Sequence, residues 1–258
     1  MAKGSYYKKY RDANPGEDSV RPASVEISDE SRKGFEEGKI LLIDKPLHWT
    51  SFDVVRKIRS SIRIKKVGHA GTLDPLASGL LIVCTGKFTK QINFLMAEEK
   101  EYTGSFTLGA VTPTYDLEST PGQHKDVSHI SLDELQRCAA KFTGPIMQVP
   151  PVYSAIKKEG TPLYELARRG ETVEPEPRPV VISSFVILSW NAPVATFKVV
   201  CSTGTYIRSL AHDFGKDLGC GAYLSSLRRT RIGNFDVEHS LTMDAFLSSL
   251  NEDAKKDS

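Results

Sequence analysis

The sequence lacks the features that mark several classes of protein. Its four cysteines are far apart, without a Cys-x-x-Cys pair, and none of its six histidines has the spacing of metal ligands. No apolar run approaches the roughly 20 residues that cross a bilayer, and no apolar signal segment stands at the N-terminus. We therefore expect reduced thiols, a cytoplasmic location and no membrane partner.

Signatures of nucleotide and hydrolase sites are missing as well. Thr85-Gly86-Lys87 resembles the end of a phosphate-binding loop, but Leu81 stands where the first glycine belongs and Phe88 follows the lysine. The chain has no Gly-x-Gly-x-x-Gly after a strand, no Gly-x-Ser-x-Gly and no His-Glu-x-x-His. We expect neither a metal nor any other cofactor.

Charge is distributed in local clusters, since the formal net charge is only +2. The stretch 54–73 contains six lysines and arginines and no carboxylate, and it ends at Asp74. Asp74 lies in the glycine-rich stretch 68–79, directly before Pro75. An aspartate before proline ordinarily closes a turn. The alternative is a catalytic carboxylate at the end of a basic surface.

The chain divides into a leader, a globular domain and a tail. Residues 1–38 hold seven basic and eight acidic residues and few large aliphatics, which predicts a flexible leader. The domain is expected over 39–250, with a strand at 39–44 and a helix from Thr50 or Ser51 to Ser61 that turns Phe52 and Val55 inward. Residues 251–258 are expected to be a polar tail.

Later segments of the domain contain more strands than helices. Residues 148–156 are strand-like, 157–179 interrupt the pattern as an inserted arm, and 180–190 with 195–201 indicate a hairpin. A capping box at Ser131 and Glu134 begins one helix, another is expected near 206–218, and the last covers 241–250. The pattern favours an α+β fold with a mixed, mostly antiparallel sheet and flanking helices.

Six stretches of the chain, in this order, resemble motifs of the TruB family of pseudouridine synthases, the tRNA pseudouridine-55 synthases. They are Gly38–Pro46, Gly68–Gly79, Lys100–Tyr102, Gln148–Ala155, Ser202–Arg208 and Tyr223–Arg229. The resemblance implies the pseudouridine synthase fold with a catalytic cleft. It also implies an isomerase that converts the T-loop uridine at position 55 of tRNA to pseudouridine, without a cofactor.

The resemblance also implies roles for individual residues. Asp74 would be the catalytic aspartate, Tyr102 would stack on the target base and Arg208 would pair with Asp74. His69 would fill the space that the flipped nucleotide leaves in the T-loop. Further substrate-binding residues would be Leu227, which lines the pocket, Lys45 with Pro46, which brace Tyr102, and also Tyr206 and Asp116.

The inserted arm, 157–179, resembles the family's RNA-binding thumb. Its cations suit RNA phosphates: Lys157, Lys158, Arg168 and Arg169. Without the resemblance, Tyr102 would be interpreted as a strand anchor, Arg208 as a structural ion pair and Lys45 as a surface lysine.

The chain departs from the family pattern in two places. The family often has Thr-Asp-Thr-x-Asp after the Tyr102 strand, whereas Thr112-Pro113-Thr114-Tyr115-Asp116 keeps only the second acid. Many members continue into a PUA domain, and we expect none here. The expected partner is the T-arm of tRNA, bound by a monomer without a guide RNA.

The reaction implied by the resemblance breaks the C1′–N1 bond of uridine and rejoins the base through C5. Asp74 could attack C1′, attack C6 or remove the 2′ proton. A glycoside or nucleoside hydrolase is a rival, but it usually needs a second carboxylate nearby, and the stretch before Asp74 has none. A non-catalytic RNA-binding protein and a guide-RNA-dependent synthase are two further rivals.

Overall fold

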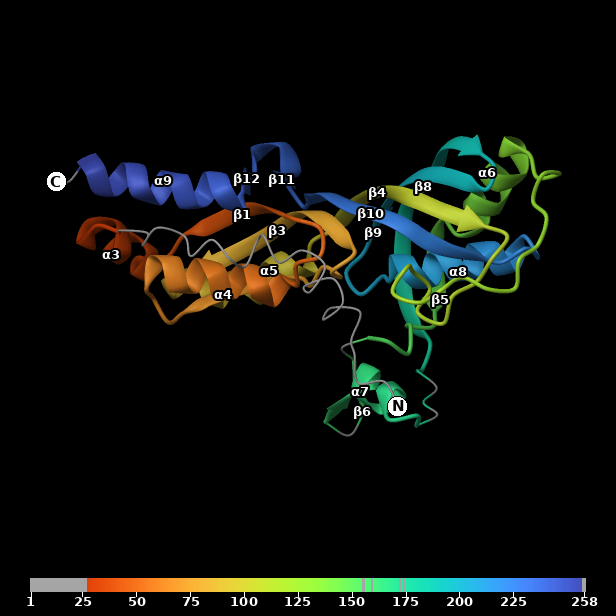
Figure 1. Ribbon diagram of the computed structural model, residues 1–258, viewed down its shortest axis with the longest axis horizontal. Coiled ribbons are helices and arrows are strands. Elements are labelled where there is room, and N and C mark those ends of the chain that lie inside the picture. The colour runs from red at the N-terminus through yellow and green to blue at the C-terminus, as the bar shows by residue number, and fades with distance from the viewer. Residues whose placement is uncertain (1–26, 155, 159, 172, 174, 257–258) are drawn as a thin grey trace. The chain divides into compact units, whose positions relative to one another are not determined.

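The computed structural model describes residues 27–154, 156–158, 160–171, 173 and 175–256 (Figure 1). The chain forms two compact units. Unit 1 comprises Met1–Glu98 with Arg228–Ser258, and unit 2 comprises Glu99–Leu227. Strand β10 (Ala222–Ile232) belongs to both, with residues 222–227 in unit 2 and 228–232 in unit 1.

Unit 1 is built on strands that pair mostly antiparallel. β1 (Ile40–Lys45) and β2 (Val67–Ala70) each run antiparallel to β3 (Ala77–Thr85), while β12 (Leu241–Thr242) is parallel to β1. β10 is the neighbour of β3 in the sheet and also pairs with β11 (Phe235–Asp236). The helical segments are α3 (Asp29–Glu37), α4 (Ser51–Ile62), the 3-10 turns η1 (Gly86–Gln91) and η2 (Val237–His239), α5 (Ile92–Ala97) and α9 (Met243–Lys256).

The core of unit 1 lies on both faces of its strands. On one face, Ile43 and Leu81 pack with buried side chains of α3, α4 and α9, which lie beside β1 and β3 (Figure 1). On the other face, Leu80 and Ile82 pack with Leu95 of α5. Alternate residues of β3 therefore enter different clusters, as the two-residue period of a strand requires.

Unit 2 has a four-strand path that continues from β10. The order is β10, β4 (Lys100–Leu108), β9 (Val194–Cys201), β8 (Arg178–Asn191) and β5 (Gly144–Gln148). β4 with β9, β9 with β8 and β8 with β5 are antiparallel. The rings of Phe106 and Phe185 on these strands pack with Phe214 of α8 (Ile207–Asp217), and Phe106 also stacks on Phe197.

Two further parts of unit 2 complete it. Helix α6 (Leu132–Lys141) packs on β8 and buries Leu135, Cys138 and Ala139. The inserted arm contains the short hairpin β6 (Lys157–Lys158) and β7 (Thr161–Pro162), followed by α7 (Leu163–Arg168). β8 begins at Arg178, so the arm ends at residue 177 and not at 179 as expected.

The structure confirms the expected fold class, an α+β arrangement with a mixed and mostly antiparallel sheet. Thr50 caps α4 through a capping box with Asp53, and Ser131 caps α6 through one with Glu134. The hairpin expected at Asn191-Ala192-Pro193 joins β8 to β9. These elements follow from local patterns of caps and alternation.

Several expectations are wrong. Residues 29–37 form α3, so the flexible leader does not extend to residue 38. Residues 251–256 continue α9, so no separate polar tail begins at 251. The strand near 148 is β5, which ends at Gln148, and 149–154 form no strand. Phe52 is 60% exposed, because Val54, Val55 and Ile58 form the buried face of α4.

Within the described part of the chain, no helix combines the length and the apolar character needed to cross a membrane.

Helix α3 contributes to the core through Phe35, which is 4% exposed and packs edge-on against Phe246 of α9 at 6.4 Å between ring centres. We predict that Phe35→Ala lowers the free energy of unfolding by about 3–5 kcal/mol, because it removes a buried ring and leaves a cavity. Urea unfolding measures the change. Phe52→Ala is the control and should change stability by less than about 1 kcal/mol. Equal effects of the two variants would contradict a core role for α3.

Candidate active site

Asp74 lies in unit 1, in the loop that joins β2 to β3, and its side chain is half-buried. Its carbonyl accepts a hydrogen bond from the Ala77 amide at 3.0 Å, which closes a turn around Pro75. The Pro75 carbonyl accepts from the His48 amide at 2.7 Å. The backbone carbonyl of Asp74 therefore closes this turn, and the turn fixes the backbone from which the carboxylate projects.

Helix α4 holds the residue before Asp74. The Ser51 hydroxyl, at the first position of α4, donates to the Leu73 carbonyl at 3.2 Å and accepts from the Leu73 amide at 2.9 Å. Both groups are buried. The amide and the carbonyl of Leu73 are thus both hydrogen-bonded to Ser51, which leaves the backbone of Asp74 little freedom.

Lys45 ends β1 and is 0% exposed, so the interpretation as a surface lysine is wrong. Its ammonium donates to the carbonyls of Pro46 at 2.9 Å and Trp49 at 2.7 Å, which fixes the turn into α4. Burial lowers the pKa of Lys45 to about 8, while the charge of Asp74 acts in the opposite direction. Lys45 and Asp74 therefore interact electrostatically within unit 1.

Two adjacent arginines of β10 complete this part of the site. Arg228 makes a two-pronged ion pair with Asp44, at 3.0 and 2.7 Å between nitrogen and oxygen. Arg229 is buried and donates to the carbonyls of Leu80, Gly71 and Thr72. Sequence reasoning found the motif that contains these residues but assigned them no role. The available signal was a cation at an inward-facing position of a strand.

His69 lies on β2, half-buried, in the same unit as Asp74. Burial and the positive charge of Arg229 lower the pKa of its imidazole. Both effects favour the neutral form of the imidazole.

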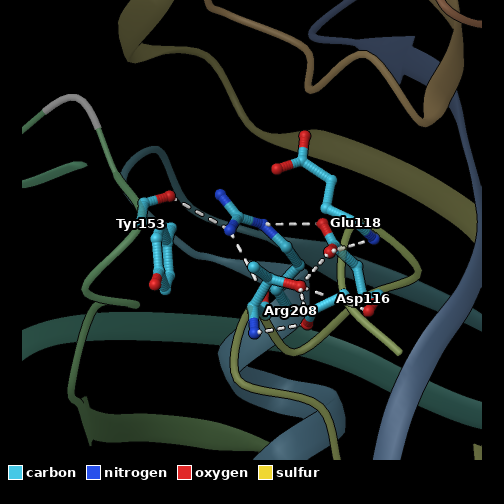
Figure 2. Close-up of polar contacts among 6 residues, drawn as sticks. Asp116, Glu118, Tyr153 and Arg208 are labelled. Carbon is cyan, nitrogen blue, oxygen red and sulfur yellow. Dashed lines mark hydrogen bonds and ion pairs between the residues drawn. The ribbon is translucent and has the colours of Figure 1, made fainter. Parts of the chain in front are cut away.

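Unit 2 contains a second cluster, centred on Arg208 in the first turn of α8. Figure 2 shows the guanidinium of Arg208 between the Tyr153 backbone and the Asp116 side chain. Its Nη1 donates to the carbonyls of Tyr153 at 3.1 Å and Thr114 at 3.4 Å, and its Nε lies 3.7 Å from the Asp116 carboxylate. Both charged side chains are buried.

Asp116 is held by its own segment. Its Oδ1 accepts from the Thr114 hydroxyl at 2.6 Å and from the Glu118 amide at 3.0 Å (Figure 2). The residue expected to bind substrate is thus a buried anion that pairs with Arg208. The segment 114–118 and helix α8 are joined through this pair.

Gln148 fixes the start of α8 and was not identified from the sequence. Its amide group donates to the Tyr206 carbonyl at 3.1 Å and accepts from the Tyr206 amide at 2.8 Å. The Ser209 hydroxyl donates to the Val149 carbonyl at 2.7 Å. The segment after β5 therefore wraps the helix terminus that carries Tyr206 and Arg208. The signal in the sequence was a glutamine that directly follows the apolar residues Ile146 and Met147.

Tyr102 is buried in β4, opposite Val199 of β9, and Leu227 is half-buried on β10. In the arm, Arg169 is exposed and lies 3.7 Å from Glu165. The backbones of Lys157, Lys158 and Arg168 lie in β6 and α7, and their side chains lie outside what the structure describes.

Each unit thus brings a different set of expected residues together. Unit 1 gathers Asp74, Lys45 and His69, and unit 2 gathers Arg208, Asp116 and Tyr206. Pairing of Arg208 with Asp74 and bracing of Tyr102 by Lys45 and Pro46 each join residues of both units. Both stay predictions.

Two family models match the chain. The TruB family pseudouridylate synthase N-terminal domain matches residues 59–207, and the tRNA pseudouridylate synthase B C-terminal domain matches 208–258. Among curated proteins, the tRNA pseudouridine synthase B of Flavobacterium johnsoniae is 50% identical over 83% of this chain and 96% of its own length. That of Clostridium tetani is 48% identical over 80% of this chain and 71% of its own.

Among solved structures, a Cbf5–Nop10–Gar1 complex contains a chain that superposes with a TM-score of 0.67 at 28% identity. The match covers 89% of this chain and 63% of that one. An H/ACA RNP bound to a substrate RNA containing 2′-deoxyuridine matches with a TM-score of 0.63, also at 28% identity, and covers 85% of this chain and 56% of that one. The chain thus spans less than two thirds of these structural relatives.

We predict that Lys45 makes stability rise with pH in the alkaline range. Its pKa is about 8 in the folded protein, against 10.5 for an unperturbed lysine, so between these values the unfolded chain binds more protons than the folded one. The stability of the wild type relative to Lys45→Met should therefore increase between pH 8 and pH 10, by at most about 1.4 kcal/mol per pH unit. Urea unfolding at several pH values measures this difference. Lys87→Met, which removes an exposed lysine of unit 1, is the control, and a difference for Lys45→Met that stays flat or falls would contradict the prediction.

A second prediction concerns the buried pair of Arg208 and Asp116. Asp116→Asn leaves the guanidinium buried without its anion and should cost about 3–5 kcal/mol of stability. Glu165→Gln is a matched control, because Arg169 and Glu165 lie at the same 3.7 Å but are exposed. It should cost less than about 1 kcal/mol. Thermal or urea unfolding of the two variants compares them, and similar small losses would show that the buried pair is not needed.

Proposed function

Since this chain belongs to the TruB family of tRNA pseudouridine synthases, which are isomerases, we propose that it modifies uridine 55 in the T-loop and that Asp74 is its catalytic residue. The observation that carries the proposal is the setting of Asp74. Its loop is tied to α4 through Ser51 and to β10 through Arg229, beside the buried ammonium of Lys45. A carboxylate on a loop whose backbone is held this firmly, close to buried positive charge, is suited to act on a bound base or ribose.

The proposed reaction is an isomerisation within one nucleotide. The C1′–N1 bond breaks, the uracil turns, C5 bonds to C1′, and the hydrogen of C5 leaves as a proton while N1 gains one. No electrons are gained or lost overall, and no cofactor is consumed. In each of the three routes, by attack at C1′, attack at C6 or removal of the 2′ proton, Asp74 acts as the ionised carboxylate.

In this proposal, the residues of unit 2 bind the target base and hold Arg208 in place. Tyr102 stacks on the uracil, which compensates part of the cost of removing the base from the stacked T-loop. Arg208 pairs with Asp74, and Asp116 acts through Arg208 by holding it. Tyr206 and Leu227 line the base pocket.

In this proposal, His69 and the arm bind the RNA around the target nucleotide. The neutral imidazole of His69 fits the apolar, stacked space that a flipped nucleotide leaves in the loop. Lys157, Lys158, Arg168 and Arg169 contact phosphates of the T-arm, where positive charge contributes affinity independent of sequence.

The proposed substrate is tRNA alone, in the cytoplasm, with the enzyme acting as a monomer. The curated relatives carry the name tRNA pseudouridine synthase B, and this chain covers 96% of the one from Flavobacterium johnsoniae. The name of these curated relatives favours the tRNA substrate over a guided one.

We predict that Asp74→Asn abolishes tritium release from tRNA transcript labelled at C5 of uridine, while the Kd for tRNA stays within about threefold. Amide and carboxylate have the same shape, but the amide is neither a nucleophile nor a base at neutral pH. The assay contains only protein and unmodified transcript. Asp244→Asn, on the exposed side of α9, is the control and should retain full activity.

Near-normal release by Asp74→Asn would refute the catalytic assignment. A wild type that binds the transcript tightly but releases no tritium would instead indicate an RNA-binding protein or one that requires a guide. Replacing uridine 55 with cytidine should remove all release if this position is the target.

A further inference from the structure

Arg229 is an unusual side chain for the interior of a sheet. It stands on β10, is 1% exposed, and therefore carries its charge almost entirely out of solvent. A buried guanidinium is tolerated only where its donors find acceptors. The partners of Arg229 thus show what its burial achieves.

Three backbone carbonyls accept hydrogen bonds from Arg229, and they lie on both sides of Asp74. Nε donates to Leu80 at 2.8 Å, Nη2 to Gly71 at 3.1 Å and Nη1 to Thr72 at 3.5 Å. Gly71 and Thr72 precede Asp74 by three and two residues, and Leu80 follows it in β3. One planar group thus fixes both ends of the segment that carries Asp74.

The loop backbone is shaped to receive this arginine. Gly71 has φ +90°, a conformation that residues with a side chain rarely adopt, and it presents its carbonyl to Nη2. At Gly79, φ is +100°, and a Cβ would lie 2.3 Å from the Arg229 carbonyl oxygen. Glycine at position 79 therefore allows β10 to approach close enough for the side chain to reach the loop.

The neighbouring residue holds the strand in register. Arg228 forms its two-pronged pair with Asp44 of β1 and lies 3.5 Å from the Ser78 hydroxyl. Because Arg228 and Arg229 are adjacent, the pair with Asp44 fixes the backbone from which Arg229 extends. The ion pair of Arg228 thus fixes the backbone position of Arg229, and the Arg229 side chain in turn holds the loop.

We propose that Arg229 is a positioning residue for the isomerisation: it ties the Asp74 loop, at Gly71 and Thr72, to Leu80 of β3 so that the carboxylate is placed for the reaction, without contacting the RNA. The proposal rests on the proposed role of Asp74. A displacement of about 1 Å in a reacting group can cost about 100-fold in rate, so a clamp on the loop backbone affects the chemical step more than RNA binding.

The charge of Arg229 also reaches the groups around Asp74. Burial is the main cause of the lowered pKa of Lys45 and of His69, and the charge of Arg229 acts in the same direction on both. Lys45 is faced as well by Asp74, Asp53 and Asp44, which raise its pKa. The arginine thus belongs to the same electrostatic cluster as the loop that it holds.

The test compares Arg229→Lys, Arg229→Met and a matched control, Arg231→Met. Arg231 stands on the same strand and also donates to a backbone carbonyl, that of Gly233 at 2.8 Å, outside the Asp74 loop. Tritium release gives kcat and KM for each variant. Hydrogen exchange of the Leu73 and Ala77 amides, which are bonded to Ser51 and to the Asp74 carbonyl, reports the order of the loop.

We expect kcat to fall about 100-fold or more for Arg229→Met and about 10-fold for Arg229→Lys, with KM for tRNA within about threefold. Lysine retains the charge but cannot reach three separated carbonyls, which explains the partial effect. The Leu73 and Ala77 amides should exchange faster in both variants. Arg231→Met should keep kcat within about twofold of the wild type.

A folded Arg229→Lys with unchanged kcat, or with losses in kcat and KM that parallel those of Arg231→Met, would overturn the proposal. If Arg229→Met does not fold, the result with Arg229→Lys decides. Asp74→Asn distinguishes a failure of the proposed function from a failure of the proposed role of Arg229. Activity in Asp74→Asn refutes the proposed function, whereas an inactive Asp74→Asn beside a fully active Arg229→Lys refutes only the role of Arg229.

Discussion

Buried cations that are satisfied by backbone carbonyls are the constraint on which the two clusters depend. Lys45, Arg208 and Arg229 are 0%, 6% and 1% exposed, and each donates to two or more carbonyl groups of the backbone. A buried charge that loses its partners costs several kcal/mol. The segments that supply these carbonyls are therefore rigid for as long as the cations stay buried.

Both units use this constraint in the same way. Arg229 extends from a strand to the loop carbonyls of Gly71 and Thr72, and Arg208 extends from a helix to the carbonyls of Thr114 and Tyr153. In each case a regular element supplies the cation and a loop supplies acceptors. A site built on loops gains precision when regular elements hold it, which is the requirement for a catalytic group that must be placed within a fraction of an ångström.

The elements that could be predicted from sequence are those that local patterns determine. The capping boxes of α4 and α6 and the β8–β9 hairpin depend on residues within a few positions of one another. Helix α3 was missed because it buries mainly Phe35, and one ring is a weak signal until its partner on α9 is known. The partners of Arg229 could not be predicted for the same reason, since the Leu80 carbonyl that accepts from it lies 149 residues away.

The departure from the family motif at Pro113 can be understood from the contacts of Arg208. A buried guanidinium needs an anion and several acceptors, and the second acid of the motif, Asp116, supplies the anion at 3.7 Å. The Thr114 carbonyl and hydroxyl support the arginine and Asp116 respectively. The anchoring requirement is therefore met by residues after position 113. Proline lacks both a charge and an amide hydrogen. It can stand at the first acid position because Asp116 still supplies the counter-charge of the buried Arg208.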